Sequence, residues 1–129
     1  MSVKKEDFKL LSETRFAPKA IERGYAMRTM HVDVGTAKAT EKPVSEDMKK
    51  RFTGGKGFGL KLLWDAVKPT TKWNDPENEI VIGMGPICGN TNYPGSGKSL
   101  VVSISPLTGI PIDSNVGGYF GPYLKFGGW

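Results

Sequence analysis

Alternation of apolar and polar residues predicts two β-strands, at residues 27–34 and 99–105. Residues 37–42 are a candidate hairpin partner of the first strand, across Gly35-Thr36, and the short apolar run 80–82 predicts a third, buried strand. The alternating apolar side chains, which we expect to face the interior, are Met30, Val32 and Val34 in the first strand and Leu100, Val102 and Ile104 in the second.

Two segments have the pattern of short helices. Residues 45–52 carry acids in the first turn and bases in the last. After the glycine-rich run 54–59, apolar residues at i, i+3, i+4 and i+7 predict a helix that stops before Pro69, with Leu60, Leu63, Trp64 and Val67 on one face.

The rest of the chain has little periodicity. Residues 106–129 read mostly as turns with aromatic residues, and residues 1–24 read as an N-terminal extension with room for one short helix. The predicted fold is therefore α+β, with mostly antiparallel strands, two short helices and glycine-rich loops. We expect a single domain over 25–129.

Composition narrows the classes of function. The 17 glycines gather between apolar runs, which fits either a turn-rich domain or a backbone that approaches a bulky ligand closely. The net charge of +5 is modest. Residues 1–28 contain seven basic and four acidic residues, which indicates either an acidic partner surface or scattered charge in contact with solvent. No basic-aromatic platform for nucleic acid is present.

Cysteine usage and hydropathy bear on the compartment. Cys88 is the only cysteine, which excludes an internal disulfide and a multi-cysteine metal site within this chain. No run has the length of a membrane span, and the charged residues 1–24 lack the apolar core of a signal peptide. We expect a cytoplasmic chain without a membrane span.

The stretch NYPGSGKS, residues 92–99, is close to a phosphate-binding Walker A loop. Gly97, Lys98 and Ser99 match the end of that motif, but Asn92 replaces its first glycine. The residues that follow have a strand pattern, so no helix N-terminus is expected to hold a phosphate. This argues against a nucleotide hydrolase. The glycines at 54–59 leave two interpretations open: an anion-binding helix start, or a tight turn that packs a helix onto a sheet.

Four blocks carry a more specific signal through their order: TGGKGFGLKLLWDAV, DPENEIVIGMGPICG, PGSGKSLVVSISPLTG and DSNVGGYFGPYLKFGG. In this order and spacing they resemble the N-terminal domain of the tungsten-containing aldehyde ferredoxin oxidoreductase family. The resemblance covers residues 24–129. It implies a tungsten bis-molybdopterin cofactor with a nearby [4Fe–4S] cluster and a magnesium ion bridging the two pterin phosphates.

The resemblance also implies roles for individual residues. Lys98 stands where the family usually has an arginine that contacts the pterin and the cluster. Asn115 matches a residue whose backbone carbonyl binds the magnesium, and Gly117, followed by Gly118, matches a cofactor-contacting glycine. Lysine supplies the charge without arginine's rigid fork. Tyr119 and Phe120 are open to two uses, packing beneath the pterin or in the core.

The same resemblance implies what this sequence lacks. The cluster cysteines of the family lie beyond residue 129, so the cluster ligands are not in this chain, and no catalytic residue can be named. Cys88 is then expected to be a small buried residue, and His31 a structural or solvated one.

Together these observations predict an N-terminal part, or a split subunit, of an oxidoreductase that converts aldehydes to carboxylic acids. Its expected partners are the remainder of the catalytic chain or a second subunit, a small-molecule substrate, and ferredoxin or an iron–sulfur subunit as electron acceptor. The extension 1–24 is expected to dock on a second subunit. Two alternatives stay open: an aromatic acyl-CoA reductase of the same family, and a non-catalytic piece that completes a partner's sheet.

Overall fold

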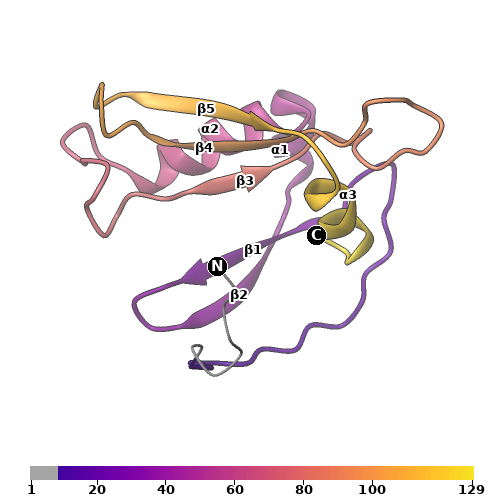
Figure 1. Ribbon diagram of the computed structural model, residues 1–129, viewed down its shortest axis with the longest axis horizontal. Helices are drawn as coiled ribbons and strands as arrows, with labels where there is room; N and C mark the ends of the chain where they lie inside the picture. Colours follow the sequence, from indigo (N-terminus) through magenta and orange to yellow (C-terminus); the bar gives the residue numbers. More distant parts are fainter. Residues whose placement is uncertain (1–8) are drawn as a thin grey trace, which may run out of the picture.

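The computed structural model describes residues 9–129, which form an α+β fold of antiparallel strands and short helices (Figure 1). In chain order the elements are β1 (Arg28–Asp33), β2 (Lys38–Pro43), α1 (Glu46–Phe52), α2 (Lys56–Ala66), β3 (Val81–Gly83), β4 (Ser99–Ile104), β5 (Pro111–Val116) and α3 (Phe120–Phe126). This confirms the predicted fold class. Within 9–129 no helix has the length and apolar character needed to cross a membrane.

The core lies between α2 and one face of a sheet with strand order β3–β4–β5. Leu63 from α2 packs on Val102 and Ile104 from β4, and all three are buried. Val67 and Val81 border this cluster. The predicted inward face of residues 99–105 is confirmed. The predicted helix face is only partly right, because Trp64 is 79% exposed while Leu63 is buried.

The glycine run 54–59 serves close packing. We expected the helix to follow these glycines, but α2 begins at Lys56 and contains Gly57 and Gly59. A Cβ on Gly59 would lie 2.6 Å from Cγ2 of Val102, so only glycine lets the helix approach the sheet this closely. Of the two interpretations of the run, tight packing of a helix onto a sheet is what the structure shows.

The β1–β2 hairpin is antiparallel, with Asp33 opposite Lys38, and lies apart from the three-stranded sheet in Figure 1. The predicted pairing is confirmed, but the predicted burial is wrong: Met30, Val32 and Val34 are exposed. Arg28 is the buried residue of β1, at its base, and the strand then projects from the body. Alternation defines two faces of a strand without saying which face, if either, is covered.

Strand β3 is displaced by one residue from its apolar run, and its burial is one-sided. Val81 borders the core, whereas Ile80 and Ile82 are exposed on the opposite face of the sheet. The expectation that the whole run 80–82 is buried is therefore wrong. Strand β3 has α2 on one face only, so residues of opposite parity lie uncovered.

Residues 106–129 are not mostly turns, as the sequence indicated, but contain β5 and α3. The residues of β5, PIDSNV, have weak strand propensity. The strand forms because the turn after Ser105 returns the chain alongside β4: the hydroxyl Oγ of Ser105 accepts the N–H groups of Leu107 and Thr108, and Gly109 has φ +70°.

Helix α1 matches its prediction, with Ser45 as N-cap: its Oγ accepts the N–H of Met48 at 3.1 Å. Residues 9–24 contain no helix, so the short helix allowed for the extension is absent from this described part. Phe16 instead packs edge-on against Trp129, with ring centroids 4.8 Å apart. The domain boundary at 24/25 stays a prediction.

Candidate functional site

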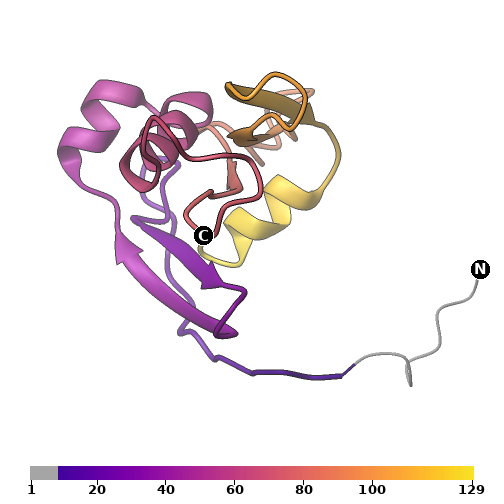
Figure 2. The same ribbon diagram turned by 90° about the vertical axis from the view of Figure 1, so that its left-hand side faces the viewer.

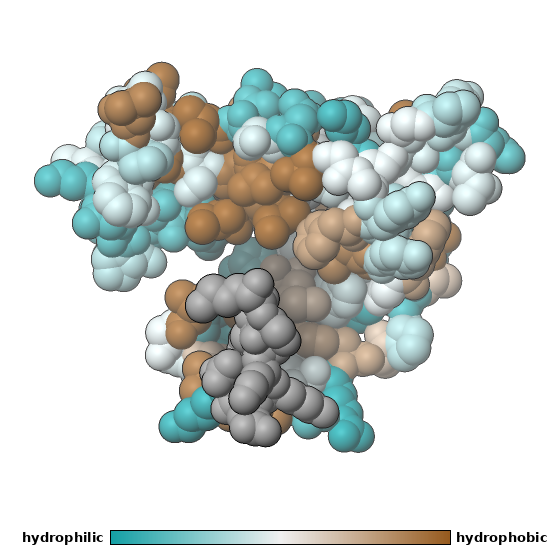
Figure 3. All heavy atoms as spheres, in the orientation of Figure 1, coloured by the Kyte–Doolittle hydropathy of each residue, from teal (hydrophilic) through white to brown (hydrophobic). Residues whose placement is uncertain are grey.

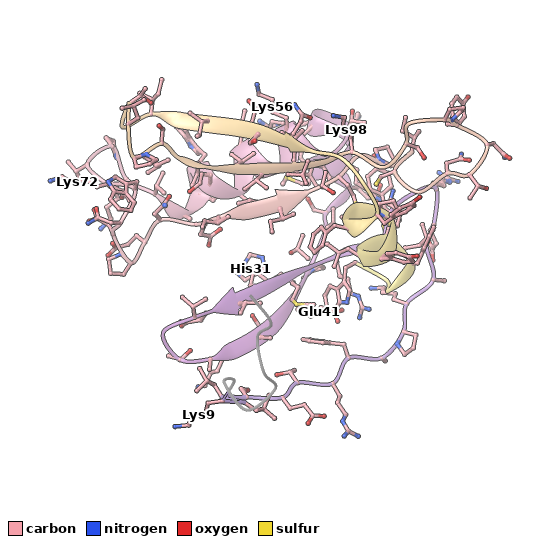
Figure 4. All side chains as sticks on the ribbon, viewed as in Figure 1. Lys9, His31, Glu41, Lys56, Lys72 and Lys98 are labelled. Atoms are coloured by element: carbon pink, nitrogen blue, oxygen red, sulfur yellow. The ribbon has the colours of Figure 1, made fainter. Side chains whose placement is uncertain are left out.

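The residues assigned to the cofactor by resemblance meet at one end of the β4–β5 pair. Ser99 and Val116 form the last pair of this ladder, so Lys98 and Gly117 leave it side by side. The two loops touch: a Cβ on Gly97 would lie 2.5 Å from the carbonyl oxygen of Gly118. The Lys98 side chain points away from the body at this end of the sheet (Figure 4). Lys98 and residues 115–118, which are at least 17 positions away from it in the sequence, thus form one surface.

The backbone carbonyl of Asn115 points away from β4, toward the outer edge of the sheet. The N–H of Ser105 donates to the carbonyl of Ile110 at 2.9 Å, which continues the β4–β5 ladder by one hydrogen-bonded pair. Because such pairs alternate in an antiparallel ladder, the Leu100–Asn115 pair is a non-bonded one, whose main-chain groups face outward. Pro111 belongs to the same outward set, as its missing N–H allows.

That outward side is an edge, since β5 is the last strand of its sheet. In the part of the chain that the structure describes, no strand pairs with β5 on that side. The carbonyl oxygen of Asn115 is therefore placed where it can bind a metal ion or a donor group, and its side chain is not needed for this.

Glycine at 117 and 118 leaves open space beside the backbone. No atom lies within 4 Å of a Cβ built on either residue, and Gly118 has φ +100°, which favours glycine. Tyr119 and Phe120 follow with 76% and 53% exposure. Their use as core residues is thus wrong, and they remain available to a ligand or partner.

A groove of about 340 Å³ continues from this turn, between the loop 89–97 and α3. Its floor includes Gly97 and Gly118, and its walls are aromatic. The combination offers flat apolar surfaces beside exposed backbone, which suits a planar ring or an extended peptide. The aromatic walls are formed by Tyr93, Tyr119, Tyr123 and Phe126.

The near-Walker sequence does not form a P-loop. Residues 89–96 close on themselves: the N–H of Gly89 donates to the carbonyl of Ser96, and Oγ of Ser96 donates to the carbonyl of Asn90. Strand β4 begins directly after Lys98. The chain that follows this loop is therefore a strand, as predicted, and it provides no helix N-terminus for a phosphate.

Buried polar groups lie beneath the site. Cys88 is buried, as predicted, and burial raises the pKa of its thiol while the nearby Lys125 ammonium opposes the rise. Lys125 is itself 5% exposed, and burial lowers its pKa. The hydroxyl of Ser99 is buried without a hydrogen-bond partner. The sequence analysis missed Lys125, since one lysine in an aromatic, turn-rich tail carries no burial signal.

His31 lies in a second cavity, of about 490 Å³, between the hairpin, α1 and α2. Its Nε2 is 3.1 Å from Oγ1 of Thr29. Burial and the charge of Lys42 lower the pKa of His31, with a smaller opposing effect from Glu79. Among residues 9–129, no three His, Cys, Asp or Glu side chains gather as a metal site would require. The cavity's charged lining also includes Asp47, Lys61 and Asp65.

Folding stability is expected to decrease as the pH falls below about 6.5. The pKa of folded His31 is lower than its unfolded value, so the unfolded chain binds the proton first. The contribution of His31 to folding stability is complete above its pKa in the unfolded chain and is lost as the pH falls toward its pKa in the folded chain. His31 is the only histidine in the chain, so urea unfolding of H31Q should show a flatter profile between about pH 5.5 and 7.5. An unchanged slope in H31Q would contradict this assignment.

Comparison with known proteins identifies the family. Residues 29–129 match the model of the aldehyde ferredoxin oxidoreductase N-terminal domain. The tungsten-containing aldehyde ferredoxin oxidoreductase of Pyrococcus horikoshii is 36% identical over 106 residues, and that of Pyrococcus furiosus is 37% identical over 102 residues. These matches cover 82% and 79% of this chain but 17% of each relative.

Two further proteins widen the range of relatives. The aliphatic sulfonate oxidoreductase WOR-like subunit of Pyrococcus furiosus is 34% identical over 108 residues, covering 81% of this chain and 17% of its own length. The solved active-site complex BamBC of benzoyl coenzyme A reductase, bound to 1,5-dienoyl-CoA, matches with a TM-score of 0.78 and 28% identity. That match covers 82% of this chain and 16% of the other. This chain therefore belongs to the aldehyde ferredoxin oxidoreductase family, in the region of its N-terminal domain.

Proposed function

We propose that this chain is the N-terminal part, or a separate subunit, of a tungstopterin oxidoreductase. The observation that carries the proposal is the convergence of Lys98, the outward carbonyl of Asn115 and the open glycines 117–118 on one surface. The residues match the chemistry of a phosphate-bearing planar group with a bridging magnesium ion: one cation, one free carbonyl oxygen and accessible backbone.

Each residue has a distinct part in holding the cofactor. Lys98 would offset the negative charge of the pterin phosphate. Asn115 would supply a main-chain oxygen ligand to magnesium, and Gly117 and Gly118 would let the pterin approach the backbone. When bound, the cofactor supplies two-electron chemistry, and this part of the chain positions it. The [4Fe–4S] cluster, like the substrate-contacting residues, would be held by other polypeptide.

The reaction we propose is oxidation of an aldehyde to a carboxylic acid, with ferredoxin or an iron–sulfur subunit as acceptor. The names of the tungsten-containing relatives support this choice. Reduction of an aromatic acyl-CoA is the second candidate, supported by the benzoyl coenzyme A reductase complex. The cytoplasm remains our proposed compartment.

Association with further polypeptide is supported by the uncovered face of the β3–β4–β5 sheet. Opposite the face that α2 covers, four aliphatic side chains are exposed, and Figure 3 shows an apolar patch over these strands. The relatives are about six times longer than the matched segment, so they contain polypeptide that could cover such a face. The exposed side chains are Ile80, Ile82, Ile112 and Val116.

The test is metal and mass analysis of the protein purified anaerobically from its native source. Tungsten and iron, together with a larger cysteine-containing polypeptide, are expected. Recovery of a metal-free 14.1 kDa species alone would contradict the enzyme proposal and favour a non-catalytic module.

Replacing Lys98 tests the site within that assembly. Lys98→Ala removes one charge-assisted contact and should reduce retained tungsten about tenfold at limiting cofactor. Asn115→Ala keeps the main-chain oxygen and should retain magnesium and tungsten, as should Lys72→Ala at an exposed position outside the site. Equal tungsten content in the Lys98 and Lys72 variants would remove Lys98 from the site.

A further inference from the structure

Helix α3 connects the glycine turn of the candidate site to the interior. It starts at Phe120, directly after that turn, and its inward residues are Gly121, Pro122 and Lys125. A Cβ on Gly121 would lie 2.5 Å from Oγ of Ser99 and 3.0 Å from Sγ of Cys88. The helix therefore sits directly on the first residue of β4, next to Lys98.

Lys125 attaches the other end of this helix to a separate loop. Its Nζ donates to the carbonyl oxygens of Gly85 and Pro86, both at 2.8 Å. Among residues 9–129 no carboxylate lies within ion-pair distance of this ammonium group. The loop that it binds continues directly to Cys88, on which Gly121 rests.

A buried ammonium group held by neutral carbonyls is a weak source of net stability. Its desolvation opposes the gain from two charge-assisted hydrogen bonds, and an apolar side chain of similar length would avoid that cost. Lys125 instead fixes an orientation between two segments, because one Nζ atom donates to two carbonyls that are 39 and 40 residues away in the sequence. That geometry fixes how α3 lies against the loop.

We propose that Lys125 is a positioning residue for the cofactor-binding end of this protein. By fixing α3 on Gly85 and Pro86, it sets the position of the Gly117–Gly118 turn relative to Lys98. The inference rests on the proposed function for the identity of the ligand, but the positioning itself is a property of the chain alone.

Hydrogen–deuterium exchange of the full chain without cofactor tests this. In K125M, the hydrogen-bonded amides of residues 123–128 in and after α3, and those of Ser99 and Val116 beside the glycine turn, should exchange about tenfold faster, because the two carbonyls lose their donor and α3 loosens. Exchange in α1 and the β1–β2 hairpin should stay unchanged, and so should the thermal midpoint within a few degrees. K125R, which keeps N–H donors, should restore most of the protection.

K72M is the matched control, since Lys72 is exposed at the far end of the sheet in Figure 4. Unchanged exchange at residues 123–128, Ser99 and Val116 in K125M, or an increase spread evenly over the chain, would overturn the proposal. If K125M does not fold, K125Q is measured with the same criteria, because its uncharged side chain is one bond shorter than lysine and cannot bring one donor to both carbonyls. Absence of tungsten from the native wild-type assembly would overturn the proposed function and leave this result untouched.

Discussion

Leu63→Ala is expected to lower the free energy of unfolding by about 2–4 kcal/mol, the largest effect of a core truncation in this chain. Leu63 is 1% exposed and packs in a cluster whose other buried members, among residues 9–129, are Val102 and Ile104. A core this small has few neighbours that could relax into the cavity. Since domains of this size are stable by about 5–15 kcal/mol, a loss of about 2–4 kcal/mol removes a large share of the folding stability.

Trp64→Ala provides the control for Leu63→Ala on the same helix. Trp64 is the larger residue but is mostly exposed, so its removal should change stability by less than about 0.5 kcal/mol. Urea unfolding followed by far-ultraviolet circular dichroism measures both variants. A larger loss for Trp64 than for Leu63 would mean that α2 faces the sheet through its other side.

Arg28→Met should lower the free energy of unfolding by about 2–3 kcal/mol. The Arg28 guanidinium donates to the carbonyls of Gly128 and Ala17, at 2.7 and 3.0 Å, and pairs with Glu41 at 2.9 Å. It also lies over the ring of Trp129, 3.9 Å from the centroid. One side chain thus joins the N-terminal segment, the hairpin and the end of the chain, and Figure 2 shows the end of the chain close to the hairpin.

Loss of Arg28 should cost less than breaking a fully buried ion pair, because Glu41 is 40% exposed and can be hydrated. Arg28→Lys should recover only part of the loss, since an ammonium group lacks the planar fork. Arg15→Met is the control, because the Arg15 side chain is 90% exposed and its pair with Glu13 contributes little. Trypsin should cleave at Lys19 faster in Arg28→Met than in Arg15→Met. Equal rates of cleavage at Lys19 in the two variants would contradict the role of Arg28 in holding the N-terminal segment.

The residues that the resemblance assigns to a cofactor lie together in the structure. Lys98, Asn115, Gly117 and Gly118 were assigned by motif resemblance, and the structure brings all four to one end of a strand pair. Their roles toward a cofactor stay predictions. Burial was harder to predict from the sequence. The apolar side chains of β1 alternate as they would in a half-buried strand, and yet they are exposed.

Local physics determined what the sequence could show by itself. Periodicity and the charges at the helix ends predicted α1, the β1–β2 pairing and the β4 strand with its inward Val102 and Ile104, since these follow from side-chain spacing and local electrostatics.

Only the tertiary structure decided the remainder. Strand β5 exists because β4 accepts it as a partner, against its own weak propensity, and α3 is held by contacts to residues far away in the chain. The same holds for the two buried cations, Arg28 and Lys125, because each is buried where carbonyl groups from distant parts of the chain accept its hydrogen bonds. Such convergence depends on long-range pairing, which no local pattern of residues encodes.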